Sequence, residues 1–183
     1  MISVLGGVIV DIHKYKKIIL IGSGGSGKSY MAKKIAQITK YPLYHLDNEF
    51  WKPDWVMTTK EEKIKRHEEL FDSETWIIDG NYNSTLEIRF AAADLVIFLD
   101  INRILCILSA AKRAGNKRSD LPDYLTERKW FSKEFAQFAK WLWNYPKYDR
   151  PKILALCDKY PDKKFLHIKS RYEVNKLLDE WRS

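Results

Sequence analysis

A glycine-rich segment at residues 22–29, Gly-Ser-Gly-Gly-Ser-Gly-Lys-Ser, combines the residue types that bind phosphate groups. It has the spacing of a P-loop, in which a glycine is followed by four residues and then by Gly-Lys-Ser. Glycines let the backbone curl so that successive N–H groups face one phosphate, and the start of the next helix adds partial positive charge. Lys28 supplies a cation for the β- and γ-phosphates, and the Ser29 hydroxyl can bind Mg²⁺.

The sequence on either side of this segment supports the same prediction. An apolar run of strand length, Lys17–Ile21, precedes the segment, and a helix-like stretch from Lys28 to about Thr39 follows it. This strand–loop–helix context is the one that the nucleotide-binding motif requires, and the alternative is a glycine-rich loop that only turns the chain. We therefore predict an ATP·Mg²⁺ site. Its nucleotide-contacting residues are Gly22, Ser23, Gly24, Gly25, Ser26, Gly27, Lys28, Ser29 and Tyr30.

Apolar runs alternate with helix-like stretches along the chain. The strand-like runs are Lys17–Ile21, Pro42–Leu46, Thr75–Ile78, Leu95–Leu99 and Lys164–Ile168. The helix-like stretches are Lys28–Thr39, Thr58–Phe71, Ser84–Ala92, Ile104–Ala114, Trp130–Trp143, Lys152–Lys159 and Tyr172–Trp181. This alternation predicts an α/β fold with a parallel sheet covered by helices on both faces. We expect a single domain over residues 1–183, with 1–16 as an N-terminal extension whose structure is left open.

Acidic residues follow three of the predicted strands, at the points where these strands end. Asp47, Asp79 and Asp100 come after the second, third and fourth runs. In an open parallel sheet, ligands bind beyond the carboxyl ends of the strands, so these carboxylates should share an edge with the phosphate loop. Any one of them could instead cap the start of a helix.

Each of these carboxylates has a predicted role. Asp79 ends an apolar strand, as Walker B acids do, and is predicted to hold Mg²⁺ together with Ser29; a cap or turn role is the alternative. Asp47 is predicted to contact the phosphoryl acceptor or to take its proton, since a base must lie within hydrogen-bond reach of the hydroxyl that it activates. Asp100 precedes a helix start, which favours capping.

Positive charge is concentrated in residues 103–152, which carry a net charge of +7, whereas residues 41–102 carry −7 and the whole chain carries +8. Phosphoryl transfer needs cations that neutralise the transferring group, and arginines on a closing segment supply them. We expect a lid-like helical segment at about 103–150. Surface ion pairs are the alternative for each arginine, and contact with a nucleic-acid backbone is the alternative for the whole basic block.

Four arginines of this basic block are candidates for phosphate contact, namely Arg103, Arg113, Arg118 and Arg150. The predicted catalytic residues of the chain are Lys28, Asp47, Arg113, Arg118 and Arg150.

Aromatic side chains form two groups. Residues 50–55, Phe-Trp-Lys-Pro-Asp-Trp, follow Asp47, where the rings could stack on a base or sugar or, as we favour, pack in the core. A second group repeats at helical spacing, which favours core packing over a base-stacking platform. This second group consists of Trp130, Phe131, Phe135, Phe138, Trp141 and Leu142.

Several classes of protein lack support in the sequence. No apolar run approaches the roughly 18 residues of a membrane span, so we expect no membrane partner. Cys106 and Cys157 form neither a metal-type spacing nor a disulfide framework, which fits a reducing, cytoplasmic setting. The histidines form no recognisable metal set, and the Asn-Lys-x-Asp pattern that selects guanine is absent.

Five segments of the chain together resemble the bacterial DNA topology modulation protein family. They are Ile21–Ser29, Tyr44–Asp47, Phe50–Pro53, Trp76–Tyr82 and Arg150–Leu154. The resemblance extends from about Lys17 to Trp181. Proteins of this family are similar to adenylate kinases, which implies a P-loop nucleotide-kinase fold: a three-layer sandwich with five parallel strands in the order 2-3-1-4-5 and a lid after the fourth strand.

The resemblance also bears on the acceptor. Asp79-Gly80 resembles the Asp-Gly of adenylate kinases, but Asn81-Tyr82-Asn83 stands where those enzymes have Phe-Pro-Arg. An arginine that helps to hold the acceptor phosphate is therefore missing. We predict an ATP-binding P-loop kinase that phosphorylates a nucleotide, a nucleoside or another small molecule. The alternative is an ATP-dependent regulator that acts on DNA topology through the basic block.

Overall fold

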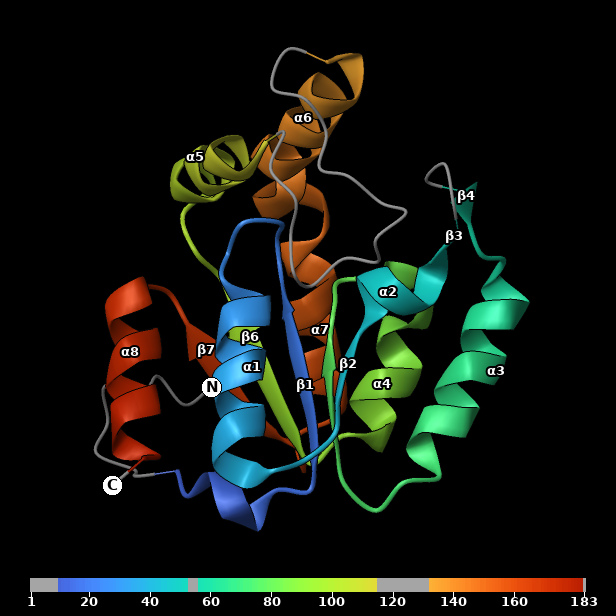
Figure 1. Ribbon diagram of the computed structural model, residues 1–183, viewed down its shortest axis with the longest axis vertical. Coiled ribbons are helices and arrows are strands. Elements are labelled where there is room, and N and C mark those ends of the chain that lie inside the picture. The colour runs from blue at the N-terminus through green and yellow to red at the C-terminus, as the bar shows by residue number, and fades with distance from the viewer. Residues whose placement is uncertain (1–9, 53–55, 115–131, 183) are drawn as a thin grey trace.

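Five parallel strands form the central sheet of the computed structural model, which describes residues 10–52, 56–114 and 132–182. The strands are β1 (Lys17–Gly22), β2 (Leu43–His45), β5 (Trp76–Asp79), β6 (Leu95–Leu99) and β7 (Lys164–Ile168). They lie in the order β2-β5-β1-β6-β7, and each neighbouring pair is parallel (Figure 1). Numbered along the chain, this is the order 2-3-1-4-5, which confirms the predicted α/β architecture.

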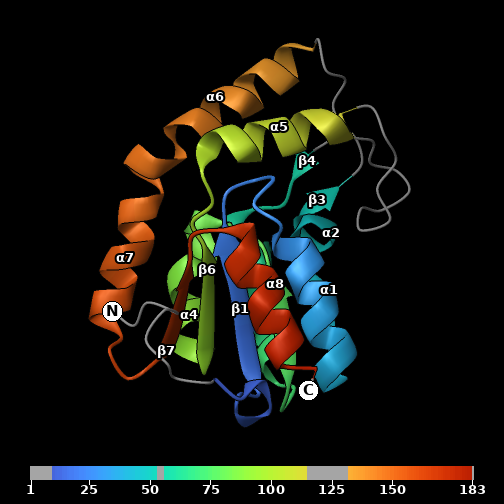
Figure 2. The same ribbon diagram turned by 90° about the vertical axis from the view of Figure 1, so that its left-hand side faces the viewer.

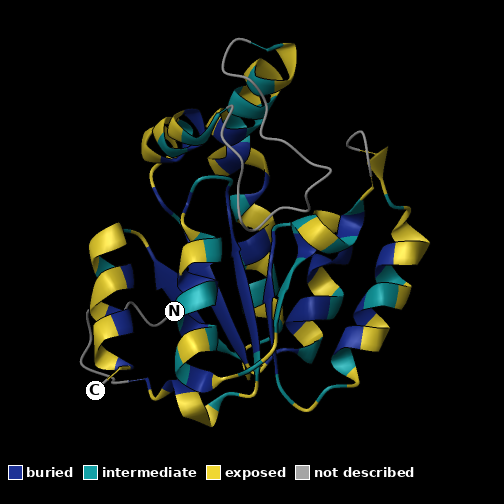
Figure 3. Cartoon of the chain, in the orientation of Figure 1, coloured by how far each residue is buried: buried dark blue, intermediate teal, exposed yellow. Residues whose placement is uncertain are grey.

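Both faces of the sheet are apolar, because successive strand residues point to opposite sides. In β1, Ile18 and Leu20 belong to one buried cluster, and Ile19 and Ile21 belong to the other. Figure 3 shows the strands buried between helices whose outer faces are exposed. Strands covered on both sides are near-continuous apolar runs, and this explains why the sequence located them to within two residues.

Helices cover the two faces of the sheet (Figure 2). One face is covered by α1 (Lys28–Thr39) and α8 (Arg171–Glu180), which contribute Ile35 and Leu177 to its cluster. The other face is covered by α3 (Lys60–Phe71), α4 (Leu86–Ala92) and α7 (Arg150–Lys159). The helix α3 begins two residues later than predicted because Thr59 caps it: the Thr59 hydroxyl accepts from the Glu62 N–H, and the Glu62 carboxylate accepts from the Thr59 N–H.

Two further helices lie above the carboxyl edge of the sheet, where the loop between β1 and α1 also lies (Figures 1 and 2). They are α5 (Arg103–Arg113) and α6 (Lys133–Tyr148). The helix α6 runs through Pro146 and ends at Tyr148, with Asp149 as its C-cap, beyond the predicted end at Trp143. The segment 115–131 between the two helices, predicted as part of a lid, lies outside the described residues.

Short elements after β2 differ from the prediction. The strand ends at His45, and Leu46–Phe50 form the helix α2, so that Asp47 lies in a first helical turn. An antiparallel pair follows, β3 (Trp51–Lys52) with β4 (Val56–Met57). Elements this short carry too few residues for a periodic pattern. The predicted helix start at Ser84 is likewise a 3₁₀ turn, η3 (Asn83–Thr85), before α4.

The end of the N-terminal extension packs onto the domain. Val10 and Ile12 are buried in the cluster under α1 and α8, and Asp11 caps a 3₁₀ turn, η1 (Ile12–Lys14). The indole N–H of Trp181 donates to the Val10 carbonyl at 2.6 Å. Residues 10–16 are therefore part of the fold, whereas residues 1–9 lie outside the described part of the chain.

Candidate active site at the carboxyl edge of the sheet

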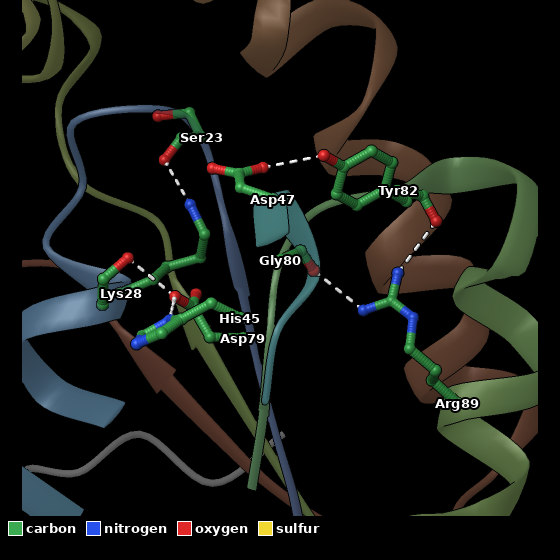
Figure 4. A network of polar contacts seen from close by, with 9 residues as sticks. Ser23, Lys28, His45, Asp47, Asp79, Gly80, Tyr82 and Arg89 are labelled. Carbon is green, nitrogen blue, oxygen red and sulfur yellow. Dashed lines mark hydrogen bonds and ion pairs between the residues drawn. The ribbon is translucent and has the colours of Figure 1, made fainter. Parts of the chain in front are cut away.

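The phosphate loop joins the last residue of β1, Gly22, to the first residue of α1, Lys28. The Lys28 ammonium folds back over the loop and donates to the Ser23 carbonyl at 2.9 Å (Figure 4). Burial lowers the pKa of Lys28, and the carboxylates of Asp79 and Asp47 act in the opposite direction. Because burial disfavours the charged form of Lys28, a bound polyanion would stabilise that charged form.

The loop also presents backbone donors. Ser26 N–H closes a turn on the Ser23 carbonyl at 3.3 Å. No acceptor within the described residues is assigned to the N–H groups of Gly25, Gly27 and Lys28. The N–H groups in the first turn of any helix lack partners inside the helix, so this loop and the start of α1 together offer a cluster of donors for anionic oxygens.

The tip of the loop is held by the two helices above it. Gly25 has φ +75°, and a Cβ built on it would lie 2.2 Å from the carbonyl oxygen of Cys106 in α5. A Cβ on Gly24 would lie 2.5 Å from the ring of Phe138 in α6. The Ser23 hydroxyl contacts the Cys106 sulfur at 3.2 Å. Glycine is thus required at this tip because α5 and α6 approach its backbone closely.

Asp79 lies at the centre of the polar site. Its Oδ2 accepts from the Ser29 hydroxyl at 2.7 Å and lies 2.9 Å from Nδ1 of His45 (Figure 4). The pairing follows from strand register, since β2 and β5 place His45 opposite Asp79. Sequence reasoning placed Ser29 with Asp79 but missed His45, because the register between two strands cannot be deduced from either strand alone.

The residues present fit a Mg²⁺ ion. The second oxygen of Asp79, Oδ1, is buried without a hydrogen-bond partner in the described residues, and the Ser29 hydroxyl is adjacent. Within the same residues, no group of three or more His, Cys, Asp or Glu side chains could form an all-protein metal cage. This combination suits Mg²⁺, which is usually held by one or two carboxylates together with substrate phosphates and water.

Asp47 is positioned by a chain of hydrogen bonds that the sequence did not reveal. The Tyr82 hydroxyl donates to Asp47 Oδ1 at 2.7 Å. Burial, followed by the Asp47 charge, raises the pKa of Tyr82, so the phenol stays a donor. Arg89 is fully buried, and it donates to the carbonyls of Gly80 and Tyr82, each at 2.8 Å (Figure 4). It donates more weakly to the Thr85 carbonyl at 3.3 Å. Arg89 thereby fixes the turn that carries Tyr82.

A second set of polar contacts joins this turn to the phosphate loop and to α6. Asn81 Oδ1 accepts from the Tyr145 hydroxyl at 3.0 Å and from the Gly22 N–H at 3.4 Å. The Asn83 side-chain amide donates to Asp149, at the junction of α6 and α7. The asparagines found where adenylate kinases have Phe-Pro-Arg therefore connect the strand β5 to the helices above the sheet.

Asp100 does not cap α5, contrary to the prediction. Asn102 is the N-cap, and its Oδ1 accepts from the Ile104 N–H at 2.9 Å. Asp100 Oδ2 instead accepts from Arg150 Nε at 2.7 Å and lies 2.8 Å from His167 Nε2. Burial alone would raise the pKa of Asp100, but hydrogen bonds from His167 and Arg150 outweigh it and lower that pKa.

The candidate arginines occupy different positions. Arg113 lies in the last turn of α5, and its charge contributes to lowering the pKa of Lys28. Arg150 is the first residue of α7 and pairs with Asp100. Arg103 stacks on the Trp143 ring, 3.8 Å from its centroid. Arg118 lies outside the described residues.

The aromatic groups are divided between the core and the surface. Phe50 is almost fully buried, as favoured for its segment, and Trp51 is half-buried; Pro53, Asp54 and Trp55 lie outside the described residues. In α6, Leu142 is fully buried, and Phe138 stacks on Trp141. Trp130 and Phe131 lie outside the described residues, and Tyr30 on α1 is exposed.

Comparison with known proteins supports the fold. No family model matches the chain, and no curated protein matches it. Among solved structures, a gluconokinase from Sinorhizobium meliloti 1021 is similar with a TM-score of 0.53 and 13% identity, over 91% of this chain and 89% of that one. A shikimate kinase from Bacteroides thetaiotaomicron is similar with a TM-score of 0.50 and 13% identity, over 90% and 95% of the two chains. The chain thus has the fold of P-loop kinases.

In the described residues, no helix is both long and apolar enough to span a membrane.

Proposed function

We propose that this protein is a phosphotransferase that moves the γ-phosphoryl group of ATP to a small-molecule acceptor. The observation that carries the proposal is the convergence of two carboxylates on one phosphate loop. Asp79 contacts Ser29 of the loop, and Asp47, at the start of α2, acts electrostatically on Lys28. The gluconokinase and the shikimate kinase described above are both named as kinases, which supports the same class.

The proposed mechanism assigns a task to each group. The loop N–H groups and Lys28 bind the phosphates of ATP, and Ser29 and Asp79 would hold Mg²⁺, which supplies positive charge to the phosphate oxygens. Asp47 accepts the proton of the acceptor hydroxyl as the hydroxyl oxygen bonds to the γ-phosphorus and the bond from that phosphorus to the β–γ bridging oxygen breaks. The products are ADP and a phosphorylated acceptor. Arg113, Arg118 and Arg150 are the candidates for stabilising charge on the transferring group.

A transfer screen with γ-labelled ATP tests this proposal. The purified protein is incubated with Mg²⁺ and with panels of nucleosides, nucleotides, sugars and other hydroxylated metabolites, and labelled products are separated from ATP. We expect transfer to one chemical class of acceptor, and a loss of at least about 10²-fold in Lys28→Ala, the scale of removing one preorganised electrostatic contact. Transfer that survives in a folded Lys28→Ala variant would contradict the role of the loop.

The alternative function, an ATP-dependent action on DNA, rests on the basic block and on the resemblance to the DNA topology modulation family. Part of that block, residues 115–131, lies outside the described residues. Within the described part, the Arg113 charge acts on Lys28 and Arg150 is bound to Asp100. The effect of the Arg113 charge on Lys28 favours a role of α5 over the phosphate loop, so the kinase is the function we propose, and the family resemblance stays a prediction.

A further inference from the structure

Lys63 in α3 is a buried cation. Its exposed fraction is 5%, and lysine is almost never buried to this degree unless its charge is paired. Burial lowers the pKa of Lys63, opposed by the charge of Glu62. Most of the Lys63 side chain is buried, so its charged form has lost part of its hydration, and an anionic ligand would compensate for that loss.

The groups around the ammonium are aromatic. Lys63 Nζ lies 5.7 Å from the ring centroid of Phe50 and 5.7 Å from that of Tyr82. The two rings meet edge to face, with centroids 4.9 Å apart. Ring faces attract a cation, but they do not accept its three N–H donors as a carboxylate or phosphate would. In the described chain, no hydrogen-bond acceptor is assigned to these donors.

The carboxylates of this region already have hydrogen-bond or ion-pair partners other than Lys63. Glu62 binds Lys52 at 2.9 Å and the N-terminus of α3, and Glu49 binds Arg66 at 2.7 Å. Asp47 accepts from Tyr82. Arg89, the other buried cation of this region, is satisfied by three backbone carbonyls. Lys63 is thus the cation here whose charge lacks an anionic partner among the described residues.

The position of Lys63 connects it to the proposed reaction. The Tyr82 ring lies between the two groups: its face is near Lys63, and its hydroxyl holds Asp47. Lys63 and Asp47 therefore contact the same tyrosine side chain. We propose that Lys63 binds an anionic group of the acceptor, a carboxylate or a phosphate, while Asp47 contacts the hydroxyl that is phosphorylated. The proposal rests on the proposed function and names its substrate class as hydroxylated anions.

Lysine NMR tests this directly. Protein labelled with ¹³C at the lysine ε-carbon is saturated with ADP and Mg²⁺, which fills the phosphate loop, and is titrated separately with inorganic phosphate and with acetate. The Lys63 resonance is assigned by its loss in Lys63→Met. Backbone amide resonances, that of Tyr82 in particular, report binding in every variant. Lys65→Met is the matched control, because Lys65 lies exposed on the same helix.

We expect a saturable shift of the Lys63 resonance with at least one of the two anions, and the anion that binds more tightly identifies the acceptor group. Lys63→Met should weaken binding at Tyr82 by about tenfold or more, the scale of a charge-assisted hydrogen bond, and Lys65→Met should leave it unchanged. The absence of a saturable shift with both anions, or equal affinity in Lys63→Met, would overturn the proposal.

A further arm separates this inference from the proposed function. The titration is repeated without nucleotide on Lys28→Ala, whose phosphate loop is expected to bind anions weakly. A saturable Lys63 shift there supports the anion site even if the protein does not transfer phosphate. ATP transfer to a neutral acceptor, with no anion effect at Lys63, would support the kinase and reject the anion site.

Discussion

In the proposed mechanism Asp47 depends on Tyr82 for its orientation, and this makes Tyr82 a positioning residue rather than a catalytic one. The Tyr82 hydroxyl is the donor that holds Asp47 Oδ1, and Arg89 fixes the turn that carries it. A carboxylate that accepts a proton must face the acceptor hydroxyl. Free rotation of Asp47 would therefore reduce the rate of the chemical step more than it would reduce ATP binding.

We predict that Tyr82→Phe lowers kcat about tenfold or more, since it removes a hydrogen bond to a charged group, and leaves the Kd for ATP unchanged. Steady-state kinetics with the acceptor found by the transfer screen, combined with calorimetric ATP binding, measures both quantities. Tyr44→Phe is the control, because Tyr44 lies on the neighbouring strand β2 and no hydrogen bond of its hydroxyl is assigned in the described residues. Equal effects of the two substitutions would show that Tyr82 does not position Asp47.

At the scale of elements, the helices above the sheet shape the phosphate loop by close contact. The backbone of α5 meets Gly25, which also has a positive φ. By contrast, Gly27 has φ +97°, but a Cβ added to it would meet no atom within 4 Å. Alanine substitution at each of the two glycines therefore distinguishes the effect of backbone strain from the effect of steric contact with α5.

We predict that Gly25→Ala weakens ATP binding by more than tenfold and lowers the unfolding midpoint, because the added methyl group displaces the loop from α5. Without nucleotide, Gly27→Ala should lower the unfolding free energy only by the cost of the left-handed backbone, about 1–2 kcal/mol. Thermal unfolding and ATP titration of both variants provide the comparison. If Gly27→Ala proves as damaging as Gly25→Ala, the contact with α5 is not what constrains the loop.

The buried His67 in α3 makes the stability of the fold depend on pH. His67 is fully buried, its Nε2 lies 3.0 Å from the Thr85 hydroxyl, and it stacks on Phe71. Burial, assisted by the charge of Arg89, lowers the pKa of His67 to about 3. Between pH 6.5 and 3 the unfolded chain binds a proton here that the folded chain does not, so stability is lost as the pH falls.

We predict that protonation of His67 in the unfolded chain lowers the unfolding free energy by about 2 kcal/mol as the pH falls from 7 to 5. The limiting slope is about 1.4 kcal/mol per pH unit. Urea unfolding of the wild type and of His67→Gln at both pH values measures the difference. The variant should lose this part of the pH dependence whatever its stability at pH 7. Parallel pH profiles of the two proteins would contradict the assignment.

Long elements were predictable from the sequence, and contacts between elements were not. The helix at 28–39 and the strands Leu95–Leu99 and Lys164–Ile168 were located to the residue, because buried runs and periodic stretches are explicit in the sequence. The phosphate loop was recognisable from its spacing. In contrast, the pairs Tyr82–Asp47 and Arg150–Asp100 join residues 35 and 50 positions apart, and local patterns carry no information about such distances.

In the whole molecule, positive and negative charges are concentrated in different regions. The basic helices α5 and α6 lie over the carboxyl edge of the sheet (Figure 1), where the phosphate loop and the carboxylates of Asp47 and Asp79 also lie. A cationic region above a phosphate site fits a lid that closes over ATP. If this region bound DNA, the affinity for DNA would instead fall strongly as the salt concentration rises.

We predict that charge reversal at Arg113 and Arg118 together impairs phosphoryl transfer at least tenfold, as expected when cations near the transferring group are replaced by anions. DNA affinity should be weak and non-specific in the wild type and in the variant. Filter binding at several salt concentrations and the transfer assay measure the two effects. Tight, salt-dependent DNA binding that these substitutions abolish, with ATP turnover intact, would favour the regulator.

We propose that residues 22–29 bind ATP, with Mg²⁺ held beside Asp79. Calorimetric titration of ATP, with Mg²⁺ and with EDTA, into the wild type, Lys28→Ala and Asp79→Asn tests it without knowledge of the acceptor. We predict that Lys28→Ala weakens binding at least about 10²-fold under both conditions, whereas Asp79→Asn removes the benefit of Mg²⁺ and leaves metal-free binding nearly unchanged. Wild-type affinity for ATP·Mg²⁺ in a folded Lys28→Ala protein would contradict the account.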